Sequence, residues 1–350
     1  MLSKIRKLYK FSRPLKSIIY ANITGKRIPI RLDLNVTKFC NLRCSYCYVD
    51  FDDLKNKPEI PASQWNQLLS DMYKRGTRAV RIMGGEPLIR DDIGLIIDHA
   101  VGLGMITELN TNGYFVKKRI NELKKLDSLC ISLDGDKEAN DKLRGNGCHD
   151  RAIEAIEIAK REGIDVRIHG MVTNQTMDSL DYLAGLSKKY NISFTCAPCC
   201  LPNLKETRPD LYVDPDKTAE FYKRYLKFKR EGYRILNSIP AIEHVIRWPF
   251  KDKFVYNLSD KWPPEANSYV RCQYGHLSCY IDADGMMYAC STQWKIGLNY
   301  FDEGFERCWD YLQKHLSCVT CNTINDFSYA FKLNPYIIFE VTKEILGFGR

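Results

Sequence analysis

A regular alternation of strand-like and helix-like segments between residues 31 and 233 constrains the fold more than any other feature. Short apolar segments typical of buried strands lie at 31–37, 79–83, 106–111, 128–133, 165–173 and 192–197. Amphipathic segments typical of helices follow them, at 63–75, 92–103, 116–126, 151–162, 179–190 and 216–231. Because each helix carries the chain back to the same edge of the sheet, such repeats predict parallel strands. We therefore expect an α/β fold with six strand–helix units.

The first of these strands is followed by three closely spaced cysteines, Cys40, Cys44 and Cys47. Thiolates are soft ligands that hold zinc or iron–sulfur clusters. Three thiolates on one loop can ligate three irons of a 4Fe–4S cluster and leave the fourth iron open to a small molecule. The alternatives are a zinc loop, although zinc usually takes four protein ligands, and buried free thiols.

The second strand ends in Gly84-Gly85-Glu86-Pro87. Glycines let a backbone come close to a ligand. A glutamate at this place can accept a hydrogen bond from a cationic amine. Taken alone, the same four residues are also typical of an ordinary turn at a strand end.

Together the two motifs resemble those of the radical S-adenosylmethionine (radical SAM) superfamily. The Cys-x3-Cys-x-aromatic-Cys loop of that family matches Cys40, Cys44, Tyr46 and Cys47, and its Gly-Gly-Glu-Pro matches residues 84–87. The resemblance implies a partial (β/α)6 TIM-like barrel in which SAM chelates the open iron. It also implies that Gly84, Gly85 and Glu86 contact SAM at its methionine end, and that Tyr46 lies near the adenine.

Polar residues at three further strand ends correspond to places where the family contacts the SAM ribose and adenine. They are Asn110, Ser132 and His169. Arg144 resembles a position that pairs with the SAM carboxylate. Turn chemistry is the alternative explanation for the neighbouring Asn112-Gly113 and Asp134-Gly135.

A second cysteine cluster surrounds a strong hairpin signal at Asp284-Gly285. One cysteine before the hairpin, one after it and a Cys-x2-Cys beyond a helical stretch near 304–315 resemble the twitch domain, a shortened SPASM domain. That resemblance implies an auxiliary 4Fe–4S cluster held by Cys272, Cys290, Cys318 and Cys321. Cys279 competes as a ligand, and a zinc knuckle built from the same thiolates is the alternative.

A third cysteine group, Cys196, Cys199 and Cys200, ends the sixth strand and is expected at the mouth of the barrel. Cys196 or Cys199 could donate a hydrogen atom to a substrate radical, as in some radical SAM epimerases. The group could also hold a further cluster, with help from Cys148, or consist of buried thiols that act as small hydrophobes. Cys130 and Cys308 are expected to be structural.

The positive charge is concentrated at the N-terminus. Nine of the 52 Lys and Arg residues and none of the 43 Asp and Glu residues lie in 1–32, so the remainder is formally neutral. This arm has apolar residues at helical spacing. It is expected to pack on the core with its basic side in water, or else to contact an anionic membrane surface or an acidic substrate. The rest of the chain has no basic stripe, so nucleic-acid binding is not expected.

These observations divide the chain into 1–30 (basic arm), 31–235 (radical SAM core), 236–265 (proline-containing linker), 266–325 (auxiliary-cluster domain) and 326–350 (tail). No apolar run reaches the ~18 residues of a membrane-spanning helix, and no signal peptide is visible. Fourteen cysteines in such a chain predict metal sites in a reducing cytoplasm, with peripheral membrane contact as an alternative.

The resemblance implies reductive cleavage of SAM to a 5′-deoxyadenosyl radical, which abstracts a hydrogen atom from the substrate. With an auxiliary cluster as electron acceptor, we expect net oxidation of a small molecule such as a sugar, cyclitol, nucleoside or lipid head group. The alternatives are a maturase of ribosomally made peptides and a redox-neutral epimerase with a cysteine hydrogen donor. A non-catalytic electron carrier is the competing class. Flavodoxin or ferredoxin is the expected reductant.

Overall fold

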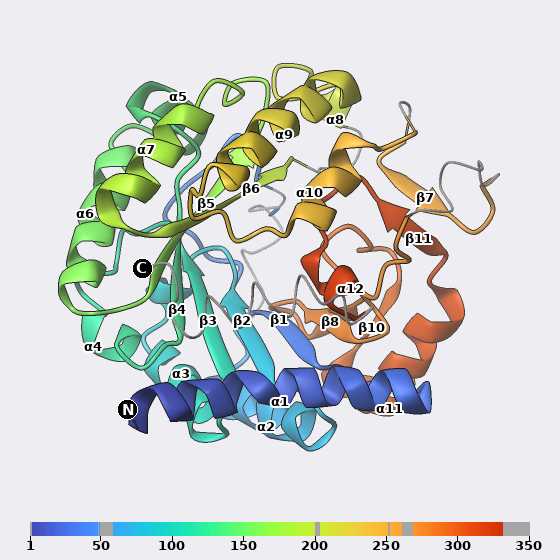
Figure 1. The fold of residues 1–350 in the computed structure, drawn as a ribbon. Coiled ribbons are helices and arrows are strands. Elements are labelled where there is room, and N and C mark those ends of the chain that lie inside the picture. Colours follow the sequence, from blue (N-terminus) through green and yellow to red (C-terminus); the bar gives the residue numbers. More distant parts are fainter. Residues whose placement is uncertain are drawn as a thin grey trace.

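The computed structural model describes residues 2–47, 49, 59–199, 204–250, 253–260 and 269–331. Cys200 and most of the predicted tail lie outside these residues. The described part is built around a nine-stranded sheet with the order β10-β9-β8-β1-β2-β3-β4-β5-β6. The sheet curves through the molecule, with most helices along its outer side (Figure 1).

The six predicted strands all form and pair parallel in chain order. They are β1 (Arg31–Asn35), β2 (Ala79–Met83), β3 (Ile106–Thr111), β4 (Ser128–Ser132), β5 (Val166–Val172) and β6 (Ser193–Pro198). The helices between and after them are α2 (Ala62–Lys74), α3 (Ile93–Gly102), α4 (Ile120–Leu123), α6 (Cys148–Arg161), α7 (Leu180–Tyr190) and α9 (Pro215–Arg230). The predicted α/β barrel of six units is confirmed.

Local details differ from the expectation. The helix predicted at 116–126 is reduced to the single turn of α4, with turns on either side. Three short elements were not predicted: η1 (Pro87–Ile89), α5 (Lys137–Arg144) and α8 (Leu204–Thr207). Short helices carry little periodic signal, so only their capping residues could have revealed them. Asp136, which caps α5 by accepting a hydrogen bond from the Ala139 amide, is one such signal.

Strand alternation separates an apolar layer from a charged interior. In β1, Leu32 and Leu34 are fully buried in the main core, which also contains Trp65 of α2. Arg31 and Asp33 alternate with these leucines and line the barrel cavity. The outer layer therefore supplies hydrophobic stability, about 1.5–3 kcal/mol for each fully buried large side chain, while the interior stays polar.

The C-terminal hairpin continues the barrel sheet. β8 (Ser278–Ile281) pairs parallel with β1, and it forms the predicted hairpin with β9 (Met286–Tyr288), followed by β10 (Gly297–Asn299). The predicted helical stretch is α11 (Tyr300–His315), with non-helical backbone at Gly304. The segment expected to be a separate small domain thus shares its sheet with the core.

The described part of the segment 236–265, which was expected to be a linker, contains a helix and a strand. It contains α10 (Ile239–Ile246), whose Ile242 and Val245 join the main core, and β7 (Val255–Asn257). Pro240 lies in the first turn of α10, where proline starts a helix without losing a hydrogen bond. β7 pairs antiparallel with β11 (Cys318–Cys321), and α12 (Asp326–Phe331) follows.

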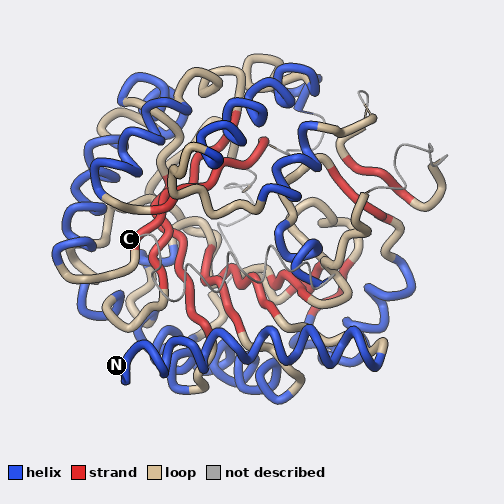
Figure 2. The backbone as a smooth tube through the Cα atoms, viewed as in Figure 1, coloured by secondary structure: helices blue, strands red, loops and turns tan. Residues whose placement is uncertain are grey.

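The basic arm forms the long helix α1 (Leu2–Thr24), which runs along one side of the molecule (Figure 2). Ile18 and Ala21 are buried against Ile30 and Leu277. The helix therefore packs on the rest of the protein, as one of the expectations from the sequence states. Among the described helices, none has the length and apolar character needed to cross a membrane.

We predict that Ile281→Ala, in β8, lowers the free energy of unfolding by about 2–5 kcal/mol because it leaves a cavity in the main core. Because β8 shares the core with the barrel, denaturant unfolding followed by fluorescence and circular dichroism should still show one coincident transition. Leu258→Ala, at a side chain that is 60% exposed, is the control and should change little. Two separated transitions would contradict a shared core.

Candidate active site

The three-cysteine loop lies directly after β1, at the carboxyl ends of the parallel strands. The Ser45 amide donates to the Leu143 carbonyl oxygen (2.8 Å), which fixes the loop against α5. Burial raises the pKa of Cys44 to about 12; the charges of Cys47, Asp134 and Cys40 add to the rise, and that of Arg144 opposes it. The thiols are therefore close enough to influence one another, and a cationic iron centre would offset the cost of ionising them.

The glycine pair lets the end of β2 lie against the backbone that enters this loop. A Cβ on Gly84 would lie 2.4 Å from the Thr37 carbonyl oxygen, and one on Gly85 would lie 2.3 Å from that of Phe39. The Gly85 amide donates to Thr37 O and the Glu86 amide to Phe39 O, both at 2.8 Å. Any larger residue would push the loop away.

The Glu86 carboxylate is fully buried between β2 and β3. It accepts hydrogen bonds from the Leu88 amide (3.1 Å), the Thr111 hydroxyl (2.8 Å) and the Asn112 amide (2.7 Å). Burial raises the pKa of Glu86 to about 7, and these three donors oppose the rise. Glu86 therefore joins two strand ends beside the loop, and its contact with SAM stays a prediction, as do those of Gly84 and Gly85.

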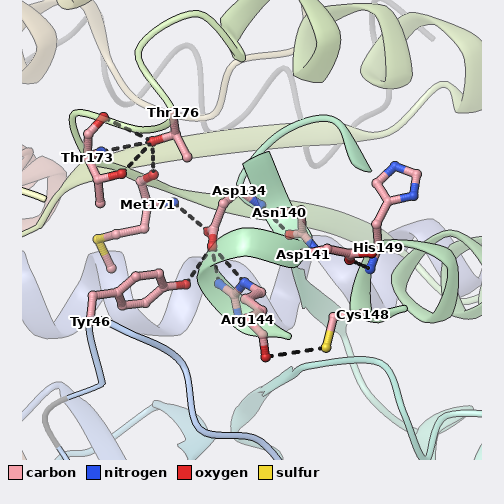
Figure 3. Close-up of polar contacts among 10 residues, drawn as sticks. All are labelled: Tyr46, Asp134, Asn140, Asp141, Arg144, Cys148, His149, Met171, Thr173 and Thr176. Atoms are coloured by element: carbon pink, nitrogen blue, oxygen red, sulfur yellow. Dashed lines mark hydrogen bonds and ion pairs between the residues drawn. The ribbon is translucent and has the colours of Figure 1, made fainter. Parts of the chain in front are cut away.

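Sequence reasoning missed the hub of the site, Asp134 (Figure 3). It accepts hydrogen bonds from the Tyr46 hydroxyl (2.6 Å), from Nε and Nη2 of Arg144 (2.7 and 2.9 Å) and from the Met171 amide (2.9 Å). Of the strand end that contains Ser132 and Asp134, the family resemblance assigns a role to Ser132 and none to Asp134. The sequence signal that could have revealed this ion pair is a carboxylate at a strand end, Asp134, followed ten residues later by Arg144.

This hub connects the cysteine loop to β4, β5 and α5. The Arg144 guanidinium also lies over the Tyr46 ring, 5.5 Å from its centroid. Arg144 is thus paired bidentately with a buried carboxylate, and its predicted contact with the SAM carboxylate remains untested. The predicted proximity of Tyr46 to adenine is likewise untested.

Two of the remaining predicted SAM contacts, Asn110 and His169, line the barrel cavity, and Ser132 pairs in register with His169. His169 Nδ1 lies 2.9 Å from the Thr195 hydroxyl oxygen. Burial, assisted by the charge of Arg81, lowers the pKa of His169 to about 4, so its imidazole is neutral near pH 7. These roles also stay predictions.

The cavity has a volume of about 420 Å³ and extends from the barrel interior to the C-terminal thiols. Cys272, Cys290 and Cys321 line it together with Asn110 and His169. Burial, assisted by the charges of Cys272 and Cys290, raises the pKa of Cys318, the fourth predicted ligand, to about 12. Within the described ranges, no three metal-ligating side chains converge as a single-ion site would require.

Cys279, the competing ligand, lies elsewhere. The Cys279 side chain is 1% exposed and lies in the main core. Burial raises its pKa, and the neighbouring Asp33 and Cys308 add to that rise. Cys308 is also fully buried, as expected of a structural residue. Cys279 therefore does not line the cavity that Cys272, Cys290 and Cys321 share, and the ligand set of the auxiliary cluster stays a prediction.

The third cysteine group is divided. Cys196 lines the cavity from β6, and burial raises its pKa, so it is a neutral thiol there. Cys199 instead packs with an apolar cluster that contains Leu143 and Leu204. Cys148 directs its sulfur to the Arg144 carbonyl oxygen at 3.5 Å (Figure 3). Cys196 lines this cavity, as does Cys130, and the role of Cys196 as a hydrogen donor stays a prediction.

Charged side chains from four strands form the cavity wall, which sequence reasoning also missed. Asp33 accepts from Arg31 (3.1 Å) and Arg81 (2.6 Å), and Glu108 pairs with Arg167 (2.9 Å). The Arg81 Nε–H has no hydrogen-bond partner in the part of the chain that the structure describes. The wall can therefore take a polar group that accepts hydrogen bonds.

The loop, the glycine contact and the barrel are the features that the radical SAM resemblance implies. Residues 34–186 match the Radical SAM superfamily, so the chain contains a radical SAM domain. The family uses a 4Fe–4S cluster and SAM, and Cys40, Cys44 and Cys47 beside the glycine contact are the residues that would hold the cluster.

Particular relatives extend the similarity beyond the core. The mycofactocin maturase MftC of Mycolicibacterium smegmatis is 27% identical over 85% of this chain and 74% of its own. The Fe-coproporphyrin III synthase of Methanosarcina barkeri is 30% identical over 46% of this chain and 42% of its own. The structure of Streptococcus suis SuiB bound to precursor peptide SuiA has a TM-score of 0.66 at 19% identity, covering 86% of this chain and 72% of SuiB. The SuiB comparison supports a shared fold.

We predict that Gly85→Ala displaces the cysteine loop, because its new Cβ cannot lie 2.3 Å from Phe39 O. The cost in stability should be about 1–3 kcal/mol, and both the iron at this loop and SAM affinity should fall. Iron content and equilibrium dialysis with SAM measure this. Gly102→Ala is the control, since no atom lies within 4 Å of its added methyl group. An unchanged iron content in Gly85→Ala would contradict the assigned contact.

We also predict that Asp134→Asn destabilises the protein by about 3–5 kcal/mol, because it leaves the buried Arg144 without a counter-charge. Tyr46→Phe, which removes one hydrogen bond to the carboxylate, should cost about 1.5–3 kcal/mol. Denaturant unfolding measures both. The exposed carboxylate of Asp150, which pairs with Lys137 and His149, supplies a control, and Asp150→Asn should have a much smaller effect than Asp134→Asn. Equal effects at Asp134 and Asp150 would refute the hub.

Proposed function

We propose that this chain is a peptide-modifying radical SAM maturase that carries one auxiliary 4Fe–4S cluster. The observation that carries the proposal is the continuous cavity that Asn110 and His169 share with Cys272, Cys290 and Cys321. A substrate in this cavity would lie between the SAM motifs and the auxiliary thiols. The similarity to a maturase over most of both chains supports the same conclusion.

Small-molecule oxidation, the main expectation from sequence, has less support. The similarity to the Fe-coproporphyrin III synthase covers less than half of this chain, whereas that to the mycofactocin maturase also includes much of the C-terminal half. The C-terminal half supplies the auxiliary thiols and the hairpin that extends the sheet. A maturase function therefore accounts for more of the chain.

When bound, the cofactors supply hydrogen-atom abstraction and one-electron acceptance. The protein supplies the geometry. Asp134 holds Tyr46 of the cysteine loop against the barrel, and Gly85 admits the backbone of that loop. The charged wall at Arg81 and Glu108 would orient polar groups of a peptide, and the buried thiol of Cys196 faces the same space. A flavodoxin or ferredoxin reductant is part of the proposal.

An anaerobic iron and sulfide count tests the cofactor content. We expect about eight irons in the wild type and about four in each of two variants, since each 4Fe–4S cluster is lost separately. One variant replaces Cys40, Cys44 and Cys47 by alanine, and the other replaces Cys272, Cys290, Cys318 and Cys321. Cys279→Ala is the matched control and should keep about eight. About four irons in the wild type would exclude the auxiliary cluster.

Substrate class is tested with SAM, dithionite and short synthetic peptides encoded beside the gene. A substrate peptide should raise 5′-deoxyadenosine formation above the level without peptide and should change in mass. The Cys40→Ala variant should show neither effect. Stimulation by sugars or nucleosides, with none by peptides, would favour the small-molecule function instead.

A further inference from the structure

A groove outside the active site, between α1 and the start of β2, is lined by basic side chains. Its volume is about 570 Å³. The basic residues that line it are Arg13, Lys16, Lys26, Lys74, Arg75 and Arg78. None of the lining residues is acidic, and Tyr9 and Tyr20 contribute aromatic surface.

The positive charge of this groove is largely uncompensated. Arg13 donates to the Gly104 carbonyl oxygen (3.0 Å), and Arg78 to that of Tyr73 (2.8 Å); both acceptors are neutral. Arg75 alone of the six basic residues pairs with a carboxylate within the described ranges. Burial and the charge of Arg13 lower the pKa of Arg78, as expected where like charges face each other. An anion in the groove would relieve this repulsion.

Exposed apolar side chains gather on the same helix. Of the nine large apolar side chains exposed in the described residues, four are on α1: Tyr9 (65%), Ile19 (39%), Tyr20 (47%) and Ile23 (80%). Their spacing places them on one helix face, whereas Ile18 and Ala21 pack inward. Basic and apolar residues together on a helix that lies against the protein are typical of helices that rest in a membrane interface.

We propose that α1 and the groove bind the surface of a membrane rich in anionic phospholipids. Lipid phosphates would occupy the groove beside Lys16, Lys26 and Lys74, while Tyr20 and Ile23 enter the headgroup region. An acidic protein would account for the cations, but it would leave unexplained why apolar side chains are exposed along one outer helix face. The membrane surface accounts for both.

The orientation of the barrel suits this placement. α1 contacts residues that directly precede the strands: Arg13 reaches Gly104 before β3, and Lys10 pairs with Asp127 before β4 (2.5 Å). The helix therefore covers the amino ends of the strands, along one edge of the molecule (Figure 1). The cysteine loop lies at the carboxyl ends, so membrane contact would leave the mouth of the active site accessible.

The test is cosedimentation of the full-length protein with vesicles. We expect binding to equal parts of phosphatidylglycerol and phosphatidylcholine, little binding to phosphatidylcholine alone, and release by high salt. The variant Lys16→Glu/Lys26→Glu/Lys74→Glu should weaken binding at least tenfold. The control Lys118→Glu/Lys188→Glu/Lys223→Glu changes the net charge equally, at exposed sites outside the groove, and should stay within about twofold of the wild type.

A second pair of variants tests the apolar contribution without a change in charge. Ile23→Ser should weaken binding severalfold, whereas Leu258→Ser, at another exposed apolar residue, should not. Circular dichroism confirms that each variant is folded. Failure of the wild type to prefer anionic vesicles, or equal loss in the two triple-lysine variants, would overturn the proposal. Binding to an acidic protein without vesicle binding would also overturn it.

Discussion

The contact between the glycine pair and the backbone of residues 37–39 is the constraint on which the rest of the site depends. It joins the ends of β1 and β2 through two backbone hydrogen bonds and leaves no room for a side chain. The cysteine loop begins directly beyond it. Asp134 fixes the far end of the loop through Tyr46. The two anchors hold three thiols at the mouth of a rigid sheet, which is the preorganisation that a reactive cofactor requires.

A second constraint is that one sheet serves both halves of the protein. Because β8 pairs with β1, the segment that carries Cys272 and Cys290 is held against the barrel wall. Cys272, Cys290 and Cys321 therefore line the same cavity as His169. In the proposed function, this geometry would make the C-terminal half part of the active site.

The sequence predicted the six parallel strands because each has a strong apolar pattern between helical segments. It also predicted the hairpin, since an Asp-Gly pair such as Asp284-Gly285 favours the tight turn of a β-hairpin. It did not predict the pairing of β8 with β1, because strand pairing over such a separation leaves no local pattern. It did not predict α10, because proline is typical of linkers as well as of the first turn of a helix, where Pro240 lies.

Within the site, motif residues were predictable and their partners were not. Cys40 and Gly85 belong to spaced motifs, whereas Asp134 acts through Arg144 and Tyr46, which tertiary structure brings together. The charged wall was hidden for the same reason. Arg81 and Glu108 each look like a polar residue on the exposed face of a strand, and only barrel closure places them in one interior.

The two-cluster active site is tested most directly by low-temperature electron paramagnetic resonance of the reduced protein with and without SAM. We expect signals from two 4Fe–4S clusters, of which one changes when SAM is added. In the variant that lacks Cys40, Cys44 and Cys47, only the signal that is insensitive to SAM should remain. A single cluster signal in the wild type, or two signals that SAM does not change, would contradict a SAM-binding cluster beside an auxiliary one.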